Sequence, residues 1–458
     1  MKKHHLILGC TAIFVLLFYK ESVGVNLALF GILLAILVFI KFQKKTILIK
    51  ILFISSLLSC FAFAWYADFF SFLSLFFSLI FLQFQNENSK LKIIQSIPAV
   101  IITGITSLGR PFIFNQWLPQ AKIDNDGAKK LIAYVLIPLL FLIVFFIAYS
   151  YGSDTFSGIF DYELDIDFWP LVFITVLGFY FSFSYWNYWV PEYFYANNHK
   201  LNNNFSTESK TDFTPSFSFL DIDFERKSGE ISLVLLNLML LVFIGTYNYE
   251  QFFKEESTSV LSAATHDRVN AVIISIIMAV GVILFYFKKG FNFDTNANFL
   301  KRLAKIWVGL NAVLIISSAV KNSEYILHFG LTYKRLGVYA FLVLTLIGLG
   351  FTYYKIKNQK TNAFLFNQMF WCVYGLILLC SFVNWGNLIT NYNISVDKGV
   401  EPIFLSKLNF NDETRRGYFS VKKLDGQYPE ILREEQISEQ QSESFLSKAL
   451  YYEFVSVK

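Results

Sequence analysis

Residues 335–356 have the sequence RLGVYAFLVLTLIGLGFTYYKI, and no charged side chain lies between Arg335 and Lys355. At a rise of about 1.5 Å per residue, this run forms a helix long enough to cross the ~30 Å hydrocarbon core of a bilayer. A helix that is apolar on every side needs either a large protein core or lipid around it. The stretch therefore predicts a transmembrane helix.

Ten further apolar runs meet or approach this length. They are residues 5–19, 23–40, 46–66, 69–84, 129–150, 168–188, 231–249, 267–287, 302–320 and 365–386. The first run follows a basic N-terminus and has no cleavage site of small residues after it, which indicates an uncleaved helix and not a signal peptide. The sequence thus predicts an all-α integral membrane protein, a polytopic helical bundle of about 11 crossings from 11–12 hydrophobic segments.

Composition agrees with this prediction. The 458 residues are 55% hydrophobic and only 16% charged, whereas a soluble domain carries about 25% charged residues. The four cysteines lie in apolar runs, without the spacing of a metal site or a disulfide framework. We therefore expect no metal and no cofactor. As partners we expect membrane lipids and another envelope protein, and no nucleic acid.

The distribution of Lys and Arg predicts the topology. Residues 92–108 (LKIIQSIPAVIITGITS) contain a proline and several polar residues, so they are ambiguous as a span. If they do not cross and the N-terminus is cytoplasmic, most basic residues fall in cytoplasmic loops, as the positive-inside rule requires. We predict a bacterial inner-membrane protein with 92–108 re-entrant or interfacial and a periplasmic C-terminal tail.

These spans and loops divide the chain into six parts. They are an N-terminal four-helix membrane part (1–84), a cytoplasmic or re-entrant connector (85–128), a two-helix membrane part (129–189) with an acidic periplasmic loop (151–167), a flexible polar loop (190–229), a C-terminal five-helix membrane part (230–387) and a polar periplasmic tail (388–458).

Candidate chemistry gathers at the ends of the later spans. The middles of the predicted spans lack Asp, Glu, Lys, Arg and His, which argues against an ion-driven transporter. His266 and Asp267 are adjacent, as an acid–base pair would be. Arg268 and Arg335 are suited to binding a phosphate or carboxylate. The competing interpretation is that His266 and Asp267 only cap a helix start.

The order of motifs in the second half of the chain suggests a family. THDRVNAV (265–272) is followed by GLTYKRLG (330–337) and by NWGNLITNYNI (384–394). This order resembles a family of multi-spanning bacterial membrane proteins known as a domain of unknown function, in its Bacteroidetes-type variant. The resemblance implies a helical inner-membrane protein and no particular activity. It singles out the following residues for test: His266, Asn311, Tyr325, Thr332, Arg335, Tyr392 and Asn393.

Three functions remain open at this point. The first is a membrane subunit or scaffold of a cell-envelope complex, favoured by the lack of catalytic motifs and of charges within the spans. The second is a transporter or flippase of a lipid-like or small polar substrate, favoured by the number of spans. The third is a membrane enzyme acting on a lipid-linked substrate at the periplasmic face, with His266 as the base.

Overall fold

The computed structural model describes residues 2–41, 46–119, 132–153, 156, 167–211, 214–216, 219–253, 258–424 and 428–456. Within these ranges the chain is helical and has no β-strand. Eight helical stretches among the described residues are long and apolar enough to cross a membrane. They are Ile47–Tyr66 (α3), Phe69–Glu87 (α4), Ala133–Ser150 (within η4, Ile132–Leu136, and α7, Ile137–Gly152), Phe168–Trp186 (α9), Ile222–Glu250 (within α12, Ile222–Phe253), Asn298–Phe329 (α14), Tyr333–Lys357 (α15) and Asn362–Cys380 (α16). The predicted fold class, an all-α polytopic membrane bundle, is confirmed.

The remaining predicted runs fall on shorter apolar helices. These are α1 (Lys3–Phe18), α2 (Val25–Lys41) and Val272–Tyr286, the apolar part of α13 (Thr258–Tyr286). Residues 92–108 form one continuous short helix, Ile93–Thr106, made of η1 (Ile93–Gln95) and α5 (Ser96–Thr106). At ~1.5 Å per residue it is about 21 Å long, which is short of a ~30 Å hydrocarbon core. The number of crossings, about 11, stays a prediction.

Short helices connect these segments and form the tail. They are η2 (Arg110–Phe112), η3 (Phe114–Gln116), α10 (Glu192–Asn197), η5 (Asn198–Leu201), α11 (Thr207–Thr211), η6 (Gly290–Asn292), α17 (Trp385–Val396), α18 (Pro402–Ser406), α19 (Asp412–Lys422), α20 (Tyr428–Ser442) and η7 (Leu450–Glu453). The loop predicted over 190–229 therefore contains helices and the start of α12. Nδ2 of Asn367 in α16 donates to Leu201 O at 2.9 Å and to Asn203 Oδ1 at 2.7 Å, which fastens this loop to a membrane helix. Most of the predicted acidic loop 151–167 lies outside the described residues.

The chain forms two compact units, and the first comprises Met1–Ala67, Leu75–Pro191 and Glu443–Ala449. In this unit α1 packs against α9 and α2 packs against α3. A Cβ added to Gly178 of α9 would lie 2.6 Å from the ring of Phe14, so glycine permits the close approach of α1. The indole N–H of Trp186 donates to the Cys10 sulfur at 3.2 Å, deep between the same helices.

The C-terminal segment Glu443–Ala449 belongs to the first unit through backbone hydrogen bonds. The N–H groups at the start of α2 have no partner within their helix. Val25 donates to Lys448 O at 3.1 Å, and Asn26 donates to Leu446 O at 3.0 Å. A segment more than four hundred residues away in the sequence thus caps α2.

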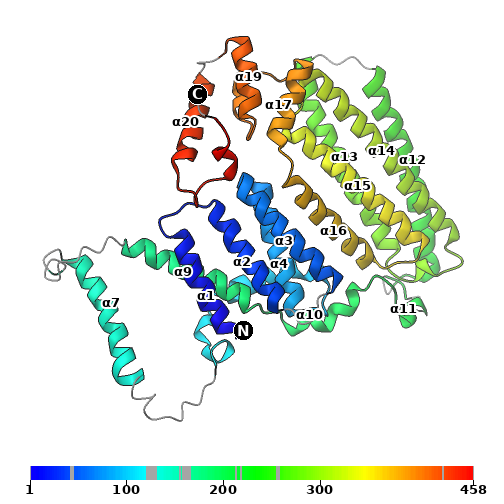
Figure 1. Ribbon diagram of the computed structural model, residues 1–458. Helices are drawn as coiled ribbons and strands as arrows, with labels where there is room; N and C mark the ends of the chain where they lie inside the picture. Colours follow the sequence, from blue (N-terminus) through cyan, green and yellow to red (C-terminus); the bar gives the residue numbers. More distant parts are fainter. Residues whose placement is uncertain are drawn as a thin grey trace. The chain divides into compact units, whose positions relative to one another are not determined.

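The second unit comprises Asp68–Ser74, Glu192–Ser442 and Leu450–Lys458. Its membrane helices α12–α16 lie side by side, with α14 in contact with α12, α13 and α15 (Figure 1). Within the apolar core, Asn237 of α12 donates to Leu303 O at 3.2 Å, and Trp307 Nε1 of α14 donates to Ala279 O of α13 at 3.2 Å. These bonds join neighbouring helices where apolar packing alone leaves their register weakly specified.

Lys355, at the end of the predicted run 335–356, is a buried lysine. It lies in the last turn of α15 and is 0% exposed. Its Nζ donates to the carbonyl oxygen of Phe287, just past the end of α13, at 2.7 Å. A cation at a helix C-terminus satisfies carbonyls that have no partner within the helix and complements the helix dipole. Lys355 therefore joins α15 to the end of α13.

Candidate functional site at the α14–α15 turn and the tail

The turn between α14 and α15 is built around a glycine. Gly330 follows α14 with φ +79° and ψ 177°, a region that is essentially restricted to glycine. A Cβ on Gly330 would lie 2.6 Å from Lys398 O and 2.9 Å from Asn393 Oδ1. Thr332 then starts α15, because its hydroxyl accepts a hydrogen bond from Arg335 N–H at 3.3 Å.

Replacing Gly330 by alanine is therefore expected to destabilise the second unit. Backbone strain and the clash with Lys398 O together cost about 2–4 kcal/mol. The measurement is the midpoint of thermal unfolding of the detergent-purified protein. Gly337→Ala is the matched control, since nothing lies within 4 Å of a Cβ there. Equal midpoints for the two variants would contradict the described turn.

Asn393 of α17 holds this turn in place. Its side chain is fully buried, and its Oδ1 accepts a hydrogen bond from Leu331 N–H at 2.6 Å. Its Nδ2 donates to Leu331 O at 3.1 Å and to Gly399 O at 3.1 Å. One carboxamide thus satisfies both backbone groups of Leu331 and one in the loop after α17. Buried backbone groups that lose such partners cost about 1–3 kcal/mol each, so Asn393 specifies how α17 meets the membrane helices.

Arg335 also stabilises this turn. Its guanidinium carbon lies 4.3 Å from the ring centroid of Tyr325, a cation–π contact between α15 and α14. Its Nη1 donates to Gly330 O, and its own carbonyl accepts a hydrogen bond from Asn322 Nδ2 at 3.2 Å. These contacts engage Arg335 in holding the turn. The predicted anion clamp of Arg335 with Arg268 stays a prediction.

The other residues singled out from the sequence have different positions. Tyr392 packs against an apolar cluster that consists of Ile326, Leu331, Ile389, Leu405, Leu408 and Phe419. Asn311 lies in α14 fourteen residues before Tyr325, which corresponds to about 21 Å along the helix. It is buried and donates to Trp307 O at 2.8 Å, away from the turn.

The candidate catalytic pair lies in α13. This helix begins at Thr258, so His266, Asp267 and Arg268 follow its first two turns and do not open it. Their side chains lie outside the described part of the structure. The acid–base hypothesis for His266 and Asp267 stays a prediction.

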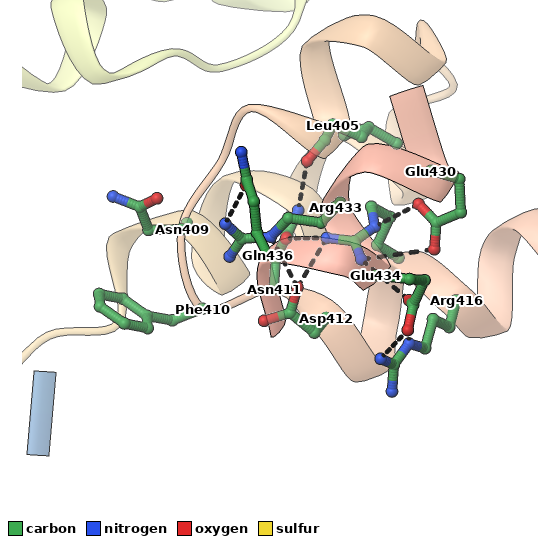
Figure 2. Close-up of polar contacts among 12 residues, drawn as sticks. Leu405, Asn409, Phe410, Asn411, Asp412, Arg416, Glu430, Arg433, Glu434 and Gln436 are labelled. Atoms are coloured by element: carbon green, nitrogen blue, oxygen red, sulfur yellow. Dashed lines mark hydrogen bonds and ion pairs between the residues drawn. The ribbon is translucent and has the colours of Figure 1, made fainter. Parts of the chain in front are cut away.

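A buried ion-pair network, here called the tail network, holds α19 against α20 (Figure 2). It consists of Asp412, Arg415, Arg416, Glu430, Arg433 and Glu434. Arg415 is 0% exposed; its Nη1 donates to Asp412 Oδ1 at 2.8 Å and its Nε to Glu430 Oε2 at 2.8 Å. Arg433 Nε donates to the same Asp412 oxygen at 3.2 Å. At the edge of the network, Arg416 Nε donates to Glu434 Oε1 at 2.6 Å.

The carboxylates of this network respond differently to their surroundings. Burial raises the pKa of Asp412, but the charges and hydrogen bonds of Arg433 and Arg415 outweigh burial, and the pKa is lowered. For Glu430 burial is the larger influence, and its pKa is raised although Arg415 pairs with it. Asp412 is therefore the firmly charged centre of the network. Buried charges of this kind are tolerated only when each has its partners.

Hydrogen bonds connect the tail network to α17. Asn411, just before α19, donates from Nδ2 to Thr390 Oγ1 of α17 at 2.7 Å. Thr414 Oγ1 donates to Asn387 Oδ1 at 2.7 Å. A Cβ on Gly386 would lie 1.8 Å from Asn409 O, so α17 and the chain before α19 are in direct backbone contact. A continuous set of contacts thus runs from the α14–α15 turn through α17 to the tail network.

Some residues of this region were already candidates from the sequence, and their role in binding stays a prediction. Sequence reasoning singled out Tyr325, Arg335 and Asn393, and the structure brings them together. It did not identify the tail network, although the i, i+3 spacing of Asp412 and Arg415 at a helix start was a usable signal. Among the described residues, no group of three or more His, Cys, Asp or Glu is arranged to hold a metal ion.

A comparison with known families covers most of the chain. The model of the family described as a domain of unknown function (DUF4153) matches residues 6–412. No curated protein and no solved structure matches the chain. The family match thus includes the α14–α15 turn and α17 and ends at the first residue of α19. The chain belongs to the DUF4153 family of domains of unknown function.

Proposed function

We propose that this protein is a membrane subunit or scaffold of a cell-envelope complex, and that its helical tail docks another envelope protein. The observation that carries the proposal is the fixed attachment of the tail. Asn393 is fully buried and joins α17 to the α14–α15 turn through bonds to Leu331 and Gly399. A tail held in this way presents its surface in one orientation relative to α14 and α15, which lowers the entropic cost of binding a partner.

The surface of the tail supports docking. Val421 of α19 is 81% exposed and Tyr428 of α20 is 72% exposed, and Ile403 of α18 is exposed as well. The charged side chains of the tail network point inward instead, where they pair with one another. A small helical module that exposes large apolar side chains beside charged ones such as Glu413 and Lys422 is suited to contact with a protein.

The experiment is affinity purification of the tagged protein from its native membrane in mild detergent, followed by quantitative mass spectrometry. We expect one protein partner in stoichiometric amount. Asn393→Leu removes the bonds to Leu331 and Gly399, so this variant should lose the partner while its abundance in the membrane is retained. Asn391→Leu is the matched control, because Asn391 is exposed on the same helix and its Nδ2 donates to Asn387 O within that helix at 3.0 Å.

Two outcomes would count against docking by the tail. In one, the wild-type protein is recovered alone. In the other, Asn393→Leu retains the partner as fully as Asn391→Leu does. If the wild-type protein is recovered without a protein partner but with a specific bound lipid, transport is favoured instead.

A second candidate function, transport of a lipid-like or small polar substrate, is favoured by one feature of the α12–α15 core. The side-chain oxygens of Asn237 and Asn311 are buried there without a hydrogen-bond partner among the described residues. Unsatisfied acceptors between membrane helices are expensive and would accept hydrogen bonds from water or a polar substrate. The test measures uptake or lipid flipping by the protein in reconstituted vesicles. Loss of this activity in Asn311→Leu would support transport, and equal rates for Asn311→Leu and the wild type would reject it.

A further inference from the structure

The segment that follows α5 places an arginine among aromatic rings. The guanidinium carbon of Arg110 lies 5.7 Å from the ring centroid of Trp189 and 5.9 Å from that of Phe183. Its Nε donates to Gln116 Oε1 at 3.2 Å. Trp117 Nε1 donates to Pro111 O at 2.9 Å, so the loop that carries Arg110 is folded back on itself.

Arg110 lacks a counter-ion in the described part of the chain. Its Nη1 is buried and has no hydrogen-bond partner there, and no carboxylate of the described residues pairs with it. A half-buried guanidinium without an anion is costly, because the charge has lost part of its hydration and gained little in return. The uncompensated charge calls for an anion from outside the described chain.

The surroundings of Arg110 indicate where that anion would come from. Leu108, Phe112 and Phe114 are all more than half exposed, on both sides of Arg110 in the sequence. Large apolar side chains in such a short segment are favourable when they insert among acyl chains, and tryptophans near them are typical of the membrane interface. The anion at that depth is the phosphate of a phospholipid, which a guanidinium binds through charge-assisted hydrogen bonds.

We propose that Arg110 and the exposed apolar side chains of residues 107–118 bind one anionic phospholipid. The guanidinium contacts the headgroup phosphate, and the acyl chains lie against Leu108, Phe112 and Phe114. An anionic headgroup is required because no carboxylate of the described residues offsets the charge of Arg110. This site belongs to the first unit, so it does not depend on docking by the tail.

The test is binding of phosphatidylglycerol to the detergent-purified protein. Native mass spectrometry detects the bound lipid, and the midpoint of thermal unfolding measures the stabilisation. The wild type should retain the lipid and gain thermal stability. Arg110→Gln should bind it about tenfold more weakly, the loss expected for one charge-assisted contact. Arg110→Lys keeps the charge but loses the planar guanidinium that lies near the Phe183 and Trp189 rings, and its affinity should lie between those of the wild type and Arg110→Gln. Lys422→Gln, an equal charge change at an exposed tail position, should match the wild type.

Control ligands distinguish an anionic phospholipid from other sources of phosphate. Phosphatidylcholine and inorganic phosphate should each give no comparable shift in the wild type. The proposal is overturned if Arg110→Gln binds phosphatidylglycerol as the wild type does, or if inorganic phosphate alone reproduces the stabilisation. Should Arg110→Gln fail to fold, a photoreactive phosphatidylglycerol on the wild type decides: cross-links within residues 107–118 support the site, and cross-links only elsewhere overturn it.

Discussion

Arg415→Ala is expected to open the tail while the membrane helices stay folded. Arg415 is fully buried and pairs with Asp412 and Glu430, each at 2.8 Å. Removing one partner from a buried ion pair costs about 3–5 kcal/mol, because the remaining charges stay buried without compensation. That cost raises the population of the open tail by more than about 100-fold. The population of the open tail is measured by hydrogen exchange of the peptides that cover α19 and α20 in the full-length protein.

Two variants make this prediction specific. Lys422→Ala lies in the same helix but is exposed, so its exchange should match the wild type. The double variant Arg415→Met and Glu430→Leu replaces one pair by apolar side chains of similar size, and should recover much of the protection. If Arg415→Ala exchanges like the wild type, the network does not stabilise the tail and the described packing of α19 on α20 is wrong.

Gly386→Ala is expected to separate α17 from the chain that precedes α19. The new Cβ would lie 1.8 Å from Asn409 O and 2.9 Å from the carbonyl carbon, and both atoms belong to backbone that cannot simply rotate away. Overpacking of this severity costs about 3 kcal/mol or more. Faster proteolysis of the tail, with the membrane helices still protected, is the expected result.

Gly417→Ala is the matched control for this substitution. Gly417 lies within α19 with nothing within 4 Å of its Cβ position. Alanine there should stabilise the helix by about 0.5–1 kcal/mol, because glycine loses more backbone entropy on folding. If Gly386→Ala and Gly417→Ala gave the same rate of proteolysis, the close contact between Gly386 and Asn409 would not exist in solution.

The membrane helices could be predicted from the sequence because length and hydropathy determine them. Within the described residues each predicted apolar run overlaps a helix, and α15 covers 333–357 where the run covered 335–356. The helix ends were less predictable. α13 begins at Thr258, nine residues before the predicted run 267–287, because polar residues continue a helix without contributing to its apolar signal.

The turn could be predicted only in part. The resemblance pointed to Tyr325, Arg335 and Asn393, but nothing in their spacing revealed that Asn393 would bond to Leu331, sixty-two residues before it. The tail network was harder still, because its pairs form only once α19 and α20 lie against each other. Pairing of Glu443–Ala449 with the start of α2 spans almost the whole chain, and no local pattern predicts such a contact.

Site-specific photo-cross-linking in living cells tests whether the tail docks a partner protein. A photoreactive phenylalanine analogue would replace Val421, which is 81% exposed on α19, and in a second strain Leu241, which is exposed on the membrane helix α12. We expect one discrete protein adduct from position 421 that disappears when Asn393→Leu is added, and no such adduct from position 241. Absence of any protein adduct at position 421, in cells where the protein is present at normal abundance, would contradict docking by the tail.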